Sequence, residues 1–118
     1  MTPIDLSEAT FDRTIAEADI ILVDFWAAWC RPCLQFAPIF EAAAASNPGI
    51  VFAKVDTEVE GHLARSSKIS SIPTLMAFRN GVLVFEEAGA LSAAGLDSVI
   101  ELVRDLDMKA VKAGTTGS

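Results

Sequence analysis

The fold of this chain is decided by one stretch, Val23-Asp24-Phe25-Trp26-Ala27-Ala28-Trp29-Cys30-Arg31-Pro32-Cys33. Its first part continues an apolar run that predicts a buried strand, and its last part holds the only two cysteines of the chain. Two thiols separated by two residues, where a strand gives way to a helix, can close a small disulfide ring and reopen it. The stretch therefore predicts reversible dithiol–disulfide exchange.

The composition predicts one globular domain, because 52% of the 118 residues are hydrophobic and 21% are charged. Nine basic against sixteen acidic residues give a net charge of −7, which disfavours nucleic acid and anionic membranes as partners. The chain shows no signal-peptide pattern and no run long enough to span a bilayer, so a cytosolic location is expected. In the cytosol a cysteine pair is more often catalytic or metal-binding than structural.

The rest of the chain alternates between apolar strand patterns and helix patterns, which predicts an α/β fold with a central mixed sheet. About five strands are expected, flanked by four helices, with the Asn80-Gly81 pair turning a hairpin between the last two strands. The globular domain is expected to cover residues 1–107, and residues 108–118 are expected to form a flexible tail. Expected strands are 4–6, 20–26, 50–56, 74–78 and 82–85, and expected helices are 7–18, 32–46, 58–67 and one starting near Ser92.

The decisive stretch resembles the active-site segment of the thioredoxin family, and the resemblance continues in order over roughly residues 4–106. Two cysteines at this spacing would by themselves be weak evidence for the family. The cysteines together with the other matching residues are specific evidence for it. Arg31 is a departure, because the family usually has glycine between the first cysteine and the proline. The matching residues outside the stretch are Pro38, Lys54, Ile72-Pro73-Thr74, Asn80-Gly81 and Gly89-Ala90.

The two cysteines are expected to have different roles. Cys30 would stand at the start of a helix, where free amides and the helix dipole stabilise a thiolate, so it is the expected nucleophile. Cys33, one turn further in, would resolve the mixed disulfide. Asp24 lies in a buried strand, so its pKa should be raised toward neutrality, which suits proton transfer. The resemblance implies that Asp24 helps to deprotonate Cys33 and that Lys54 pairs with Asp24.

The resemblance also implies a substrate surface around the cysteines. Pro73 would form a cis peptide bond facing the disulfide, because proline is the residue for which that isomer costs least. The backbone of Ile72 would then pair with an extended substrate segment, as in strand addition. The docking surface expected from the resemblance comprises Trp29, Ile72, Pro73, Gly89 and Ala90.

Arg31 and Pro32 fill the ring between the cysteines, and the charge of Arg31 has a predicted consequence. Its guanidinium should favour the Cys30 thiolate, which makes the dithiol–disulfide couple slightly more oxidising. Arg31 also stands where substrates and a reductase would approach. It could therefore favour acidic substrates or impede a reductase.

The sequence thus favours a cytosolic protein-disulfide reductase, monomeric and without a bound cofactor or metal, because the dithiol is itself the redox group. The resemblance implies recycling by a flavin- and NADPH-dependent thioredoxin reductase. Two other functions stay open. One is a binding module that docks a partner without redox turnover. The other is a dimer that shares a metal or cluster between cysteine pairs, since structural zinc needs four ligands and the only histidine is His62.

Overall fold

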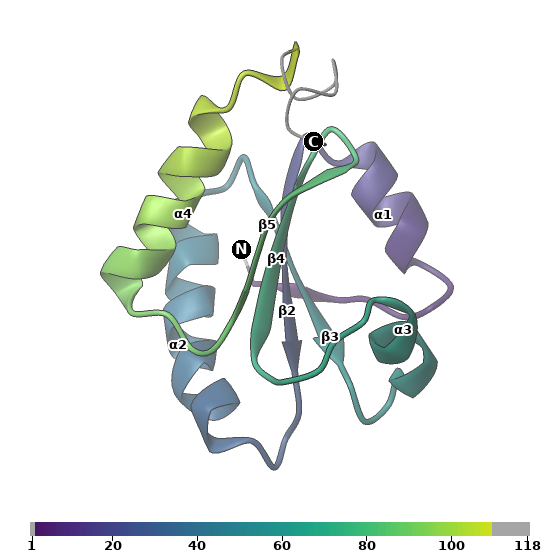
Figure 1. Cartoon of the computed structure of the whole chain (residues 1–118). Coiled ribbons are helices and arrows are strands. Elements are labelled where there is room, and N and C mark those ends of the chain that lie inside the picture. Colours follow the sequence, from purple (N-terminus) through teal and green to yellow (C-terminus); the bar gives the residue numbers. More distant parts are fainter. Residues whose placement is uncertain (1, 110–118) are drawn as a thin grey trace.

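The computed structural model describes residues 2–109, and these residues form the mixed α/β fold that the sequence predicted. The fold alternates strands and helices before it closes with a hairpin and a last helix (Figure 1). Its strands are β1 (Ile4–Asp5), β2 (Ile20–Trp26), β3 (Val51–Asp56), β4 (Thr74–Arg79) and β5 (Val82–Ala88). Its helices are α1 (Phe11–Glu17), α2 (Arg31–Ser46), α3 (Gly61–Ser66) and α4 (Ala93–Asp105).

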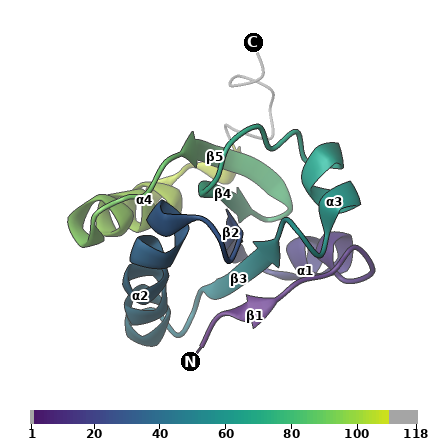
Figure 2. The same ribbon diagram turned by 90° about the horizontal axis from the view of Figure 1, so that it is seen from below.

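The five strands form one sheet in the order β1-β3-β2-β4-β5 (Figure 2). β2 is central, and it pairs parallel with β3 and antiparallel with β4. The strand can take this place because its pattern is apolar at every position except Asp24. Five of its seven residues are buried, and Asp24 is one of them. The sequence motif therefore begins in the middle of the sheet.

Helices α2 and α4 cover one face of the sheet, and α1 and α3 cover the other (Figure 1). Successive residues of β2 point to opposite faces. Leu22 packs with Phe36 and Phe40 of α2, whereas Val23 packs in the other core with Phe11 of α1. Asp24 shares the face of Leu22, so its carboxyl group points toward the layer formed by α2.

Three elements begin or end three or more residues from the expected position. One of them is α3, which begins at Gly61 rather than at Glu58. α1 begins at Phe11 rather than Ser7, because residues 7–10 form a turn in which the Ser7 amide donates to Thr10 Oγ1 over 3.0 Å. β5 continues to Ala88, three residues beyond the expected Phe85, because β4 supplies backbone partners along its length. The hairpin itself is confirmed, with φ of 53° at Asn80 and 81° at Gly81.

One residue of the expected tail, Met108, packs against the rest of the chain. Met108, the first residue of the expected tail, is only 9% exposed and therefore belongs to the packed part of the chain. The sequence gave no sign that Met108 would be buried, because a single apolar residue after a charged one forms no helix or strand pattern. Lys109, the next residue of the predicted tail, is exposed, and residues 110–118 lie outside the described residues.

Arg79 ties the end of β4 to the end of α4. Its Nη1 donates to the carbonyl oxygens of Val103, Arg104 and Leu106 over 2.9, 2.8 and 2.8 Å. The last carbonyls of a helix have no partner inside the helix, so a cation that reaches them satisfies them and complements the helix dipole. This contact fixes α4 on the sheet.

Replacing Arg79 by methionine is expected to lower the free energy of unfolding by about 1.5–3 kcal/mol, since hydrogen bonds to a charged donor are lost and carbonyls lose their partner. Urea unfolding followed by circular dichroism measures this change. Arg13→Gln, at an exposed arginine of α1, is the control and should change the free energy by less than about 0.5 kcal/mol. Equal stability of Arg79→Met and wild type would contradict the assignment.

Candidate active site

The two cysteines are joined in a disulfide across the first turn of α2. Cys30 is the N-cap residue of the helix, and the Cα atoms of the pair are 5.2 Å apart. Pro32 fits the turn between them, because a proline there removes an amide that would have no partner within the helix. The amide of Cys33 lies 3.2 Å from Cys30 Sγ and donates to it. A thiolate at Cys30 would therefore meet a hydrogen-bond donor and the positive end of a helix.

The two cysteines differ in their access to the surface groove beside the disulfide. Both residues are buried, with 4% of Cys30 and 2% of Cys33 exposed. Cys30 nevertheless lines a groove of about 470 Å³, which we call the Cys30 groove, and Cys33 is not among the residues that line it. A disulfide that approaches through this groove meets Cys30 first, with Cys33 behind it.

The loop before β4 lies beside the disulfide. The peptide bond between Ile72 and Pro73 is cis, as the resemblance implied, and the Ile72 carbonyl oxygen lies 3.7 Å from Cys30 Sγ. The Pro73 side chain is buried, so this residue shapes the backbone of the site and offers no docking surface of its own. Gly89, from the end of the hairpin, donates its amide to the Pro73 carbonyl over 2.8 Å.

The other residues of the expected docking surface lie partly on the outside of the molecule. Trp29 is 69% exposed, so most of this large apolar side chain is open to contact with a partner. Gly89 and Ala90 are exposed, and Ile72 is partly buried. Of these residues only Trp29 and Ile72 line the Cys30 groove, whereas Gly89 and Ala90 lie outside it.

Asp24 is a buried carboxyl group without a partner. It is 1% exposed, and neither carboxylate oxygen has a hydrogen-bond partner among the described residues. Burial removes water from the charged form, and this raises the pKa of Asp24 from its ordinary 3.8 to about 7. The positive charge of Lys54 acts in the opposite direction and offsets only part of the rise. The group can therefore exchange a proton near neutral pH.

Lys54 does not pair with Asp24 in the way the resemblance implied. The two residues are directly opposite in the β2–β3 ladder, yet no ion pair joins them within residues 2–109. The Lys54 ammonium instead lies 4.4 Å from the centroid of the Trp26 ring, a cation–π contact. An aromatic ring at the end of β2 competes for the ammonium, and the strand pattern alone could not predict this.

Several groove residues were missed by the reading of the sequence. They come from the turn after β3, from α3 and from the loop before β4, and they are Thr57, Ala64, Ile69, Ser70 and Ser71. The Ser70-Ser71 pair gave only a turn signal. These residues follow Cys33 by 24 to 38 positions in sequence, and the strand order brings them to the same end of the sheet.

Residues 2–109 contain neither a membrane-spanning helix nor a cluster of metal-binding side chains. Within them, no helix is long and apolar enough to cross a bilayer. No three or more histidine, cysteine or acidic side chains in this part of the chain come together as a metal site. The His62 Nε2 lies 3.3 Å from Glu8 Oε1, and both side chains are exposed. His62 belongs to α3, whereas the two cysteines lie at the start of α2.

A disulfide that closes across the first turn of a helix, with one sulfur facing a groove, is built for exchange with other thiols. The buried carboxyl group in the central strand can exchange a proton near neutral pH. Together with the mixed five-stranded sheet, this site defines the chain as a thiol–disulfide oxidoreductase.

The family follows from comparison with known proteins. The Thioredoxin family model matches residues 2–102, and the chain belongs to the thioredoxin family. A Streptomyces coelicolor protein that bears the provisional name thioredoxin 2 is 50% identical over 109 residues, covering 92% of this chain and 81% of that protein. Thioredoxin C-3 of Corynebacterium nephridii is 38% identical over 102 residues, covering 86% of this chain and 70% of that protein.

Solved structures agree with this assignment. A thioredoxin of Plasmodium falciparum matches with a TM-score of 0.78 and 33% identity, over 83% of this chain and 96% of that one. A mutant thioredoxin from Halobacterium salinarum matches with a TM-score of 0.82 and 29% identity, over 89% of this chain and 93% of that one. The expected thioredoxin-like fold is therefore confirmed.

Proposed function

We propose that this protein is a cytosolic protein-disulfide reductase that acts on disulfides of other proteins. One observation carries the proposal: Cys30 lines the groove at the start of α2, whereas Cys33 lies behind it and outside the groove. An accessible first thiol and a sheltered second one are what a two-step exchange needs.

In the first step the Cys30 thiolate attacks one sulfur of a target disulfide. A bond forms between Cys30 Sγ and that sulfur, and the other target sulfur leaves as a thiolate and takes a proton. In the second step the Cys33 thiolate attacks Cys30 Sγ, and the second target sulfur leaves. The target disulfide is reduced to two thiols, and the Cys30–Cys33 dithiol is oxidised to the disulfide that the structure contains.

Asp24 would serve the second step. The Cys33 thiol must lose a proton before it attacks, and a carboxylate with a pKa of about 7 can accept that proton by way of water and later return it. The Lys54 charge holds the pKa of Asp24 lower than burial alone would, which keeps part of the group ionised at neutral pH. Lys54 is therefore a positioning residue in this proposal.

Substrate binding would use the backbone of Ile72 beside the exposed ring of Trp29, with Gly89 and Ala90 bordering the same end of the molecule. An extended target segment that adds to the Ile72 backbone would bring its disulfide to Cys30. After turnover, a flavin- and NADPH-dependent thioredoxin reductase would reduce the Cys30–Cys33 disulfide again. The protein would act as a monomer.

The test is turnover of a protein disulfide. The purified protein is added in catalytic amount to insulin and dithiothreitol, and precipitation of the reduced insulin chains is followed by turbidity. A thioredoxin reductase with NADPH then replaces dithiothreitol, and NADPH oxidation is followed by absorbance. Catalysis in both assays is expected.

Two other outcomes would point to other functions. A protein that binds a partner but speeds neither assay would be a docking module. A reduced protein that purifies with metal or with visible absorption, in a dimer held by four thiolates, would be a metal or cluster carrier. Elemental analysis and size-exclusion chromatography distinguish a metal or cluster carrier from a docking module.

Arg31→Gly is expected to make the dithiol–disulfide couple slightly more reducing. An exposed charge next to the Cys30 thiolate contributes roughly 0.3–1 kcal/mol, and about 30 mV corresponds to 1.4 kcal/mol for two electrons. The potential should therefore fall by roughly 5–20 mV. Equilibration with glutathione and quantification of both forms measures it. A rise of the potential would contradict the argument.

A further inference from the structure

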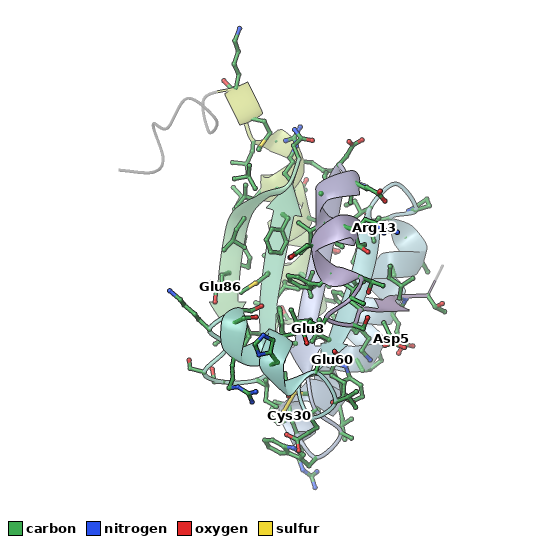
Figure 3. All side chains as sticks on the ribbon, turned by 90° about the vertical axis from the view of Figure 1, so that its right-hand side faces the viewer. Asp5, Glu8, Arg13, Cys30, Glu60 and Glu86 are labelled. Atoms are coloured by element: carbon green, nitrogen blue, oxygen red, sulfur yellow. A yellow bond between two sulfur atoms is a disulfide. The ribbon has the colours of Figure 1, made fainter. Side chains whose placement is uncertain are left out.

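Among the described residues that line the Cys30 groove, Arg31 is the only charged one. It also lines a second depression, of about 410 Å³, together with Trp29, Leu34 and Gln35. Arg31 thus lies between two concave surfaces beside the nucleophile. Figure 3 shows Cys30 at one end of the molecule, well removed from Arg13 on α1.

The charge of Arg31 is uncompensated within the described part of the chain. No carboxylate of residues 2–109 forms an ion pair with it, and the first turn of α2 contains no acidic residue. The start of α2 adds the positive end of the helix dipole at the same place. A chain with a net charge of −7 therefore presents a positive spot at the entrance to its reactive sulfur.

The surroundings of this positive spot are apolar and exposed. Trp29 is 69% exposed and Leu34 is 51% exposed, and both line the second depression with Arg31. A target segment that covers these side chains excludes water around the guanidinium. A charge contact made there is stronger than one made in open solvent.

We propose that Arg31 is a specificity-determining residue, which selects protein disulfides with an aspartate or glutamate next to the attacked cysteine. This inference rests on the proposed reductase function and adds a substrate class to it. The guanidinium provides a planar donor for a carboxylate in the docked segment, while Cys30 attacks the neighbouring sulfur. The rest of the protein is acidic and would repel the same segment, so the contact also orients it.

The test compares three short synthetic peptides, each closed by one disulfide and identical except for Glu, Gln or Lys beside the cysteine. The second-order rate constant for reduction by the dithiol form of the protein is measured by chromatography of the products. Wild type should reduce the Glu peptide about two- to fivefold faster than the Gln peptide at low salt, and the Lys peptide slower still. Raising the ionic strength to about 0.5 M should narrow these ratios.

Ratios between peptides are the readout, because a change in the reactivity of Cys30 affects all three peptides alike. Arg31→Gln should bring the Glu-to-Gln ratio to about one, Arg31→Lys should keep part of it, and Arg31→Glu should invert it. Arg13→Gln is the matched control and should leave the ratio as in wild type.

Two results would overturn the inference while leaving the reductase function intact: equal rates for all three peptides with wild type, or a preference that persists in Arg31→Gln. If wild type reduces no peptide and also fails with insulin, the proposed function itself is wrong.

Discussion

Cys30→Ser is expected to abolish catalysis of insulin reduction, and Cys33→Ser is expected to trap the substrate. A serine hydroxyl at position 30 ionises far less readily than a thiol, and it cannot form a disulfide with the target. Turnover should fall by at least about a thousandfold, the scale of loss seen when a covalent nucleophile is removed. The same turbidity assay measures it.

Cys33→Ser keeps the first attack and loses the second. A mixed disulfide between Cys30 and the target should therefore accumulate, visible by intact mass and released by dithiothreitol. Ser98→Ala, on the exposed side of α4, is a control that should match wild type. If Cys30→Ser traps the target and Cys33→Ser does not, the two roles are reversed. If both variants turn over like wild type, the pair is not a working dithiol.

Replacing Asp24 by asparagine is expected to stabilise the protein increasingly as the pH rises. The folded protein holds a proton on Asp24 up to a pH of about 7, whereas the unfolded chain releases it near the ordinary pKa of 3.8. Between these two values the folded state binds more protons than the unfolded state. Stability therefore falls with rising pH across this window, and the loss is complete above it.

The size of this loss follows from the two pKa values. Raising the pKa from 3.8 to about 7 corresponds to roughly 4 kcal/mol of free energy of unfolding, fully lost only above pH 7. Asp24→Asn has no proton to lose, so its stability relative to wild type should rise by roughly this amount between about pH 4 and pH 8.5. Urea unfolding of the disulfide forms at a series of pH values measures the difference.

Glu41→Gln, at an exposed carboxyl of α2, is the matched control and should show no such trend. A difference in stability between Asp24→Asn and wild type that stays constant from about pH 4 to pH 8.5 would contradict a raised pKa at Asp24.

Asp24→Asn should also slow the second exchange step. If Asp24 is the base, the rate constant of that step should fall by about 10²-fold or more. Slower release of target in single-turnover experiments would show it.

Local sequence determined most of the fold and the centre of the site. The nearly continuous apolar pattern of residues 20–26, interrupted only by Asp24, was enough to predict the central strand, since a strand covered on both faces carries apolar residues at successive positions. The Asn80-Gly81 turn and the start of α4 at Ser92 could also be predicted from local sequence. Each depends on the backbone conformation or the cap of a few neighbouring residues. The spacing of the two cysteines was enough to predict that they form a redox pair.

Contacts between distant segments could not be predicted from the sequence, because they depend on how strands and helices pack. Lys54 lies over the Trp26 ring because the β2–β3 register sets which side chains share a face, and the sequence does not encode register directly. Arg79 reaches the end of α4 some 24 to 27 residues away, and only the packing of the helix on the sheet brings its carbonyls within reach.

The residues that can exchange electrons follow from the sequence, because spacing within one helical turn suffices to join Cys30 to Cys33. Which of the two sulfurs a partner can reach depends on the folded chain, because α3 and the loop before β4 build the wall of the groove beside Cys30 and leave Cys33 outside it. Chemistry within one turn is local, whereas access to it depends on surfaces that the folded chain assembles from its distant parts.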